Sequence, residues 1–130
     1  MKKINTFTGP SMALISLVLM MIGTIMFGCA HTPVIGAPIN HEKLKDGIYE
    51  GSYWGWPNKA SVRVTIKGKE IYNIEITEHL AWKGKKAELP ILKRIIETQS
   101  TRVDAVSGAT NSSRVIMNAV QKAIEKAYKN

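Results

Sequence analysis

Apolar and polar residues alternate along the middle of the chain, as expected for strands that bury one face. The segments 62–66 and 72–76 both alternate in this way, on either side of a turn at 67–70. They therefore predict an antiparallel hairpin. The preceding segment, 48–56, is rich in aromatic residues and predicts a third strand, with Tyr49 and Tyr53 on the same face.

The last third of the chain changes to the spacing of amphipathic helices. A first helix is predicted near Pro90, with its apolar residues on one face. A second is predicted over 113–128, with Asn111 or Ser112 as its cap. Its apolar stripe is Val115, Ile116, Ala119, Val120, Ala123, Ile124 and Ala127. Strands followed by helices predict an α+β fold, a small antiparallel sheet packed with two helices on one face.

The N-terminal segment 1–28 differs from the rest. It begins with basic residues, contains no acidic residue and then becomes apolar up to Gly28. This order is typical of an export signal, and the Gly28-Cys29 pair resembles the acylation site of bacterial lipoproteins. The alternative is an uncleaved membrane anchor, because the run from Ser11 to Gly28 is at the short edge of what spans ~30 Å of hydrocarbon. Both hypotheses place the remaining chain outside the cytoplasm, anchored to a membrane.

Residues 29–43 contain prolines and no helical or strand period, so we expect a tether there and a single compact domain over 44–130. The chain of 130 residues has one cysteine and three histidines. An internal disulfide is therefore excluded, and no metal site is expected. The net charge of +8 does not indicate nucleic-acid binding, because no nucleic-acid motif is present and an exported chain does not meet DNA.

The loop 103–113 carries the strongest candidate chemistry. Gly108 permits a tight turn and close approach of a ligand, and small or hydroxyl residues surround it. The N-terminus of the following helix points back at this loop and is a suitable place for a phosphate beside the Thr110 hydroxyl. The alternative is an ordinary helix start, because Ser, Gly, Thr and Asn are common loop and capping residues.

The run Asp104-Ala105-Val106-Ser107-Gly108-Ala109-Thr110, followed by Asn111-Ser112-Ser113, resembles the flavinylation motif of the FMN-binding domain family. This family includes peripheral subunits of sodium-pumping quinone reductases and of Rnf-type complexes, and small lipoproteins. The resemblance extends from about Leu44 to the C-terminus. It includes Asp46-Gly47-Ile48-Tyr49-Glu50-Gly51, Glu78-His79, Leu89-Pro90 and Gln99-Ser100.

The resemblance implies that a separate FMN transferase takes FMN from FAD and joins its phosphate to the Thr110 hydroxyl as a phosphoester. The flavin would then carry electrons between a membrane redox donor and an extracytoplasmic acceptor. The other motif positions implied as cofactor-binding are Asp104, Ser107, Gly108, Ala109 and Ser113. The sequence departs from larger family members between His79 and Ala87, so the residues that contact the isoalloxazine ring are not identified.

Further residues have both a functional and a packing interpretation. Trp54, Trp56 and Trp82 could stack on the flavin or simply pack, and His79 could face the cofactor or the protein. Lys83, Lys85 and Lys86 form a cluster that could bind a phosphate, an anionic lipid surface or an acidic partner, or could simply be solvated. The alternatives to an electron carrier are a non-covalent FMN-binding module and a flavin-free lipoprotein. An enzyme with its own substrate pocket is disfavoured by the small size of the domain.

Overall fold

The computed structural model describes residues 31–129, so the predicted signal or anchor, Cys29 included, lies outside it. The elements are β1 (Gly47–Gly55), β2 (Asn58–Lys67), β3 (Glu70–Leu80), a 3-10 turn η1 (Lys85–Ala87), α2 (Glu88–Thr98) and α3 (Thr110–Lys129). None of the helices in this part of the chain has the length and apolar character needed to cross a membrane.

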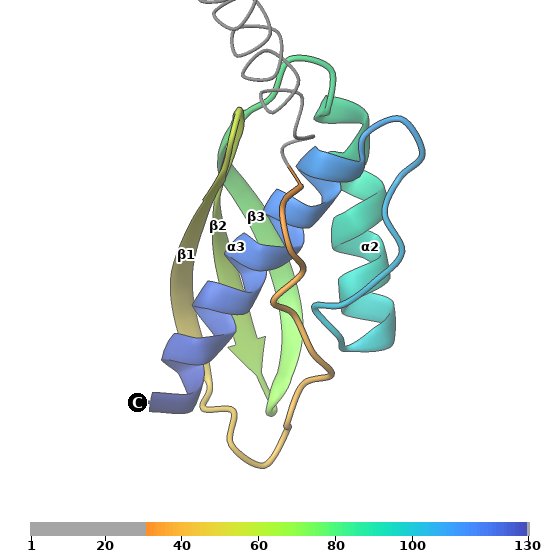
Figure 1. Cartoon of the computed structure of the whole chain (residues 1–130). Coiled ribbons are helices and arrows are strands. Elements are labelled where there is room, and N and C mark those ends of the chain that lie inside the picture. The colour runs from red at the N-terminus through yellow and green to blue at the C-terminus, as the bar shows by residue number, and fades with distance from the viewer. Residues whose placement is uncertain (1–30, 130) are drawn as a thin grey trace, which may run out of the picture.

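The three strands form one antiparallel sheet in the order β1-β2-β3, which confirms the predicted hairpin (Figure 1). The register places Tyr49 opposite Val64 and Gly51 opposite Val62, so these residues share the buried face. The turn between β2 and β3 is held by Asp46, whose carboxylate accepts the N–H groups of Lys69 and Gly68, each at 2.9 Å. These backbone hydrogen bonds lower the pKa of the Asp46 carboxyl.

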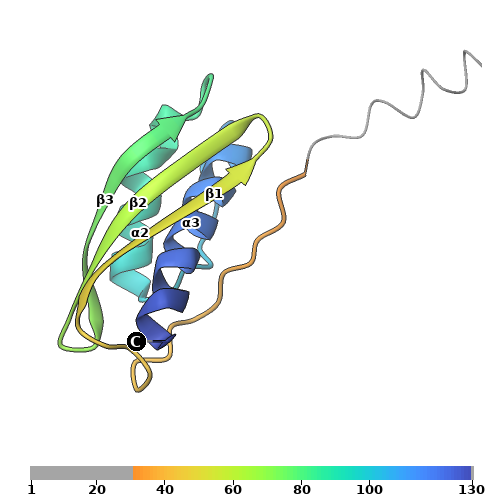
Figure 2. The same ribbon diagram turned by 90° about the vertical axis from the view of Figure 1, so that its left-hand side faces the viewer.

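Both helices pack on the same face of the sheet, which confirms the α+β prediction (Figure 2). The predicted stripe of α3 is buried completely, and Ile91 and Ile95 of α2 join it. Burying a Val or Ile side chain contributes about 1.5–3 kcal/mol, so this helix–sheet interface supplies most of the apolar driving force. The core therefore fixes α3 along its whole length and, with it, the position of its N-terminus.

Gly51 allows α3 to approach the sheet at backbone distance. A Cβ at this position would lie 2.2 Å from Ala119 O and 2.5 Å from Ala123 N. Any side chain at position 51 would therefore push α3 away from β1. Alanines on the helix and a glycine on the strand together set the spacing between the two layers.

The segment predicted as a tether is packed on the domain from Thr32 onward. We call residues 31–45 the strap; it runs along α3 (Figure 1). Asn118 of α3 holds it from both sides, by donating from Nδ2 to Pro33 O at 2.7 Å and accepting the Ile35 N–H at Oδ1 at 3.0 Å. Ile39 and Leu44 are buried in the core. Backbone N–H and C=O groups of the strap form hydrogen bonds with side chains and loops that are distant in the sequence. The residues of the strap therefore show neither helical nor strand periodicity.

The observed elements are longer than the predicted segments, in β2 and β3 as well as at the start of α3. This helix begins at Thr110 and not beyond Asn111 or Ser112, so the prediction that one of these two residues caps it is wrong. Their side chains bind other segments of the domain and are not free to cap. The helix α2 begins at Glu88, which leaves Pro90 in its first turn as predicted.

Replacing Gly51 by alanine should destabilise the domain, because the added Cβ collides with backbone atoms of α3 that cannot move alone. We expect the free energy of unfolding to fall by about 2–3 kcal/mol, the usual cost of overpacking. Urea unfolding followed by circular dichroism measures it. Ser52→Ala is the control, since Ser52 is exposed on the opposite face. Equal stability of the two variants would show that α3 is not held by this contact.

Candidate functional site

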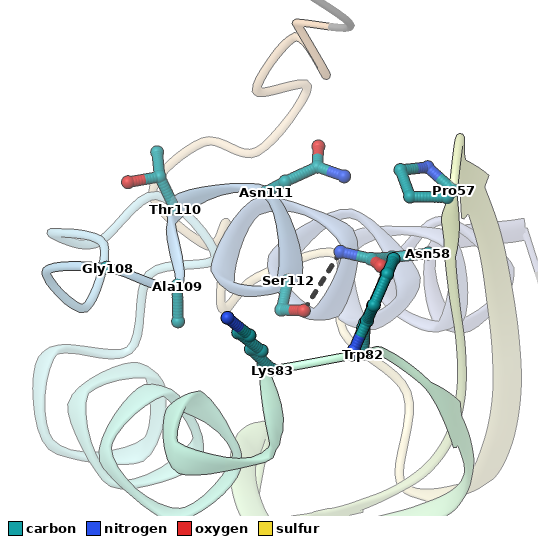
Figure 3. Close-up of a pocket in the computed structure, with 10 residues that line it drawn as sticks. Pro57, Asn58, Trp82, Lys83, Gly108, Ala109, Thr110, Asn111 and Ser112 are labelled. Carbon is teal, nitrogen blue, oxygen red and sulfur yellow. Dashed lines mark hydrogen bonds between the residues drawn. The ribbon is translucent and has the colours of Figure 1, made fainter.

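A cavity lies at the end of the domain where the β1–β2 turn, the loop 81–84 and the start of α3 meet (Figure 3). Its volume is about 440 Å³, which is within the range of small-ligand sites. The lining consists of Pro57, Asn58, Trp82, Lys83, Gly84, Gly108, Ala109, Thr110, Asn111 and Ser112. Three separate segments contribute these residues, so only the folded domain forms the cavity.

The first turn of α3 is fastened by polar side chains to the sheet and the strap. Asn111 Nδ2 donates to Gly55 O at 3.2 Å, and Asn111 Oδ1 accepts from the Thr32 hydroxyl. Asn58 Nδ2 donates to the buried Ser112 Oγ at 3.0 Å. These contacts position the helix start and explain why these side chains do not cap it.

The next residue, Ser113, holds the loop that precedes the helix. Its hydroxyl is fully buried, accepts the Val106 N–H at 3.0 Å and donates to Ala109 O at 2.8 Å. Ala109 N also donates to Val106 O at 3.0 Å, which closes a tight turn over 106–109. Gly108 has φ 73° in this turn, a conformation that favours glycine. The loop is therefore rigidly attached to the helix that it precedes.

Thr110 differs from the three residues that follow it. It is the first residue of α3, is exposed and lines the cavity. None of the hydrogen bonds found among residues 31–129 involves its side chain. Figure 3 shows its side chain pointing outward at the edge of the site. Its hydroxyl is thus accessible to a modifying group.

The electrostatic environment of the cavity is positive. Among the described residues that line it, Lys83 alone carries a charge. A second ammonium group, that of Lys86, lies close to Gly108, 2.8 Å from where a Cβ of that residue would stand. The first turn of α3 contains no acidic residue, so nothing within it offsets the positive end of the helix dipole. These features favour a bound anion such as a phosphate group.

The six cofactor-binding candidates of the sequence divide into three groups in the structure. Residues 108–110 line the cavity. Ser107 is exposed in the adjacent turn, and Ser113 lies buried beneath it as a support for the loop. Asp104 is not part of the lining, and its carbonyl oxygen accepts a hydrogen bond from Arg94 Nη1 at 2.6 Å.

The three tryptophans are all exposed, but they lie in different places. Trp82 lines the cavity. Trp54 and Trp56 line a separate shallow hollow together with His31 and Thr32, where the strap begins. The structure therefore brings one tryptophan next to the predicted cofactor loop and places the other two beside the strap.

His79 belongs to the protein interior. Its side chain is 2% exposed, and Nδ1 lies 2.7 Å from Glu88 Oε1. Nε2 is buried and has no hydrogen-bond partner in the described part of the chain. Because His79 is absent from the cavity lining, it joins β3 to the start of α2 and does not face the site.

Sequence reasoning did not identify Pro57, Asn58 or Gly84 as part of the site. Gly84 brings the loop backbone onto α3, since a Cβ there would stand 1.7 Å from Ser112 Oγ. Asn58 reaches the site through its bond with the same serine. No local pattern reveals these contacts, because each depends on a residue more than twenty positions away.

Comparison with known proteins agrees with the resemblance of the loop. The model of a family described as "FMN-binding domain" matches residues 53–125, a range that includes the whole cavity lining. A protein of Treponema pallidum (strain Nichols), described only as uncharacterized, is 36% identical over 90 residues. The alignment covers 65% of this chain and 24% of that relative. The chain thus spans about a quarter of the relative's length.

Replacing Ser113 by alanine should loosen the loop that carries Gly108, because the Val106 N–H loses its partner. We expect the free energy of unfolding to fall by about 1–2 kcal/mol and amide hydrogen exchange over 104–109 to accelerate. Exchange measured by mass spectrometry reports this directly. In the control variant Ser107→Ala, an exposed hydroxyl is removed and exchange should stay unchanged. Equal exchange in both variants would contradict a supporting role for Ser113.

Proposed function

The chain belongs to the FMN-binding domain family, and we propose that it holds FMN by a phosphoester on Thr110 and uses it to carry electrons. FMN is the cofactor of this domain. The observation that carries the covalent proposal is the contrast within the first turn of α3. The side chains of Asn111, Ser112 and Ser113 are all hydrogen-bonded within the protein, whereas the Thr110 hydroxyl is exposed at the cavity.

The residues around Thr110 fit a phosphate bound at this position. The free N–H groups at the start of α3 and the ammonium groups of Lys83 and Lys86 supply positive charge. Gly108 and Ala109 are small and leave the hydroxyl accessible to an FMN transferase. Pro57 and Trp82 provide apolar surface in the same cavity, as a flavin ring requires.

The flavin supplies the redox chemistry, since it accepts and releases one or two electrons, and the protein supplies attachment and orientation. The residues of the cavity favour a role in carrying electrons over a role in catalysing the reaction of a separate substrate. Of the two acid–base candidates, His79 is paired with Glu88 and Asp104 lies away from the lining. A phosphoester would also prevent loss of the cofactor by dilution outside the cytoplasm.

The proposal includes anchoring to a membrane through the segment 1–28, by acylation of Cys29 or by an uncleaved span. The domain would then exchange electrons with a membrane redox donor and an extracytoplasmic acceptor. The supporting features are the basic start of the segment, its apolar run and the Gly28-Cys29 pair that ends it.

A second candidate function is non-covalent binding of FMN without electron carriage. The cavity supports it, because a volume of about 440 Å³ beside a positive helix end suits a ligand whether or not a covalent bond forms. The two candidates differ in whether the flavin remains attached when the domain unfolds.

Co-expression with an FMN transferase should add about 440 Da to the exported chain, the mass of FMN less water, on the peptide that contains Thr110. Intact mass and peptide mapping under denaturing conditions measure this gain. Thr110→Ala should abolish the gain, whereas Ser52→Ala, on the exposed face of the sheet, should keep it. Flavin that stays bound to the Thr110→Ala chain through denaturation would exclude the phosphoester at this residue. If the Thr110→Ala chain and the control variant both bind flavin in the native state and both lose it on denaturation, the non-covalent candidate is favoured.

The flavinylated chain should be reduced and reoxidised reversibly, as an electron carrier requires. Anaerobic titration with dithionite, followed by ferricyanide, should bleach and then restore the visible absorbance of the flavin. The Thr110→Ala chain from the same co-expression serves as the blank. A flavin that is attached to Thr110 but does not return to its oxidised spectrum would contradict electron carriage and leave the attachment intact.

A further inference from the structure

Exposed apolar side chains gather at the end of the domain that carries the cavity. Eight large apolar residues of the described chain are exposed, and five of them lie at this end. The elements that carry them lie at the top of Figure 1: the tip of β1, the β1–β2 turn, the end of β3, the following loop and the start of α2. These residues are Trp54, Trp56, Leu80, Trp82 and Leu89. A cluster of this kind marks a surface that contacts a partner or a membrane.

Tryptophan dominates this cluster, and the chain contains only three tryptophans. Trp54, Trp56 and Trp82 are 65%, 69% and 93% exposed. Water-exposed indoles are unfavourable, whereas the headgroup region of a bilayer accommodates their apolar body and polar N–H together. Their concentration at one end of the domain therefore favours a lipid surface as the occupant.

Positive charge accompanies the apolar residues. Lys83, Lys85 and Lys86 belong to the same loop and its 3-10 turn, and within residues 31–129 no carboxylate forms a salt bridge with them. Lys59, which lies between Trp54 and Leu80 in the register of the sheet, is paired with Glu78 at 2.7 Å and adds no unpaired charge. Lysines beside interfacial aromatic residues attract anionic lipid headgroups. The charge at this end is thus complementary to a negatively charged bilayer.

The chain enters the domain at this same end. The hydroxyl of Thr32 is bonded to Asn111, and Arg114 donates to Thr32 O at 3.2 Å, so the start of the strap is fixed beside the cavity. Cys29 precedes His31 by only two residues, and a chain spans at most about 3.6 Å per residue. An anchor that ends at Cys29 therefore favours contact of this end of the domain with the membrane over contact of the opposite end.

We propose that the end of the domain bearing Thr110 rests on the membrane surface, with the three tryptophans in the headgroup layer and Lys85, which is not part of the cavity lining, facing anionic phospholipids. This inference rests on the membrane anchoring in the proposed function. It identifies the lipid surface as a second attachment, in addition to the anchor. The cofactor site is then held at the bilayer, so its redox donor is reached within or on the membrane.

Tryptophan fluorescence tests this orientation, because all three tryptophans lie at this end. The full chain is reconstituted in vesicles of phosphatidylcholine and phosphatidylglycerol, with ordinary or brominated acyl chains. Bromine on acyl-chain carbons close to the headgroups quenches indoles in the headgroup layer, so we expect at least about a twofold loss of emission in brominated vesicles. The ratio of the two emissions is compared with and without attached flavin, which cancels quenching by the flavin itself.

A relocated tryptophan provides the matched control. In a chain with all three tryptophans replaced by phenylalanine and with Tyr72→Trp at the opposite end of the sheet, bromination should leave the emission unchanged. Lys85→Glu should weaken the quenching in anionic vesicles, whereas Lys67→Glu, near Tyr72, should not. Equal quenching of the native and relocated tryptophans would overturn the proposed orientation.

Flotation of the same vesicles separates this inference from the proposed function. Chains that float with the lipid but show no quenching would support the anchoring and overturn the proposed orientation. The exposed tryptophans would then be expected to contact a protein partner. Chains that do not float contradict the anchoring and the orientation together. Quenching that disappears when flavin is attached would show that the ring, and not lipid, covers the tryptophans.

Discussion

The rest of the site depends on the hydrogen bonds that hold the first turn of α3 in place. Asn111 binds the β1–β2 turn and the strap, Ser112 binds the first residue of β2, and Ser113 binds the preceding loop. Each bond satisfies a polar group that burial would otherwise penalise by about 1–3 kcal/mol. The helix start thereby has one position relative to the sheet, and Thr110 is the one residue of that turn whose side chain is left for a ligand.

Close backbone packing extends this constraint along the helix. Gly51 allows β1 and α3 to touch at the level of Ala119 and Ala123, and Gly84 does the same for the loop over Ser112. Such contacts tolerate little displacement, because protein interiors are packed as densely as organic crystals. The N-terminus of α3 is therefore positioned by the core below it and by the loop beside it. A covalently attached cofactor would inherit this fixed orientation.

The same end of the domain combines three properties that an anchored electron carrier needs. It has an exposed attachment point at a positive helix end, an apolar wall in the cavity, and the point of entry of the chain. The point at which the chain enters the domain is fixed, because Asn118 holds the strap against α3. In the proposed function, attachment of the cofactor and attachment of the protein would therefore share one side of this small domain.

The sequence by itself determined the strands, the two helices, the α+β class and the motif around Thr110, because alternation, the helical stripe and glycine turns are local consequences of residue order. Only the tertiary structure decided where α3 begins, that the strap is packed on the helix, and that Asn58 and Gly84 complete the cavity. Each of these features depends on a contact between residues that are far apart in the sequence. Local sequence patterns do not predict such contacts, because they form only when the folded core has brought both groups together.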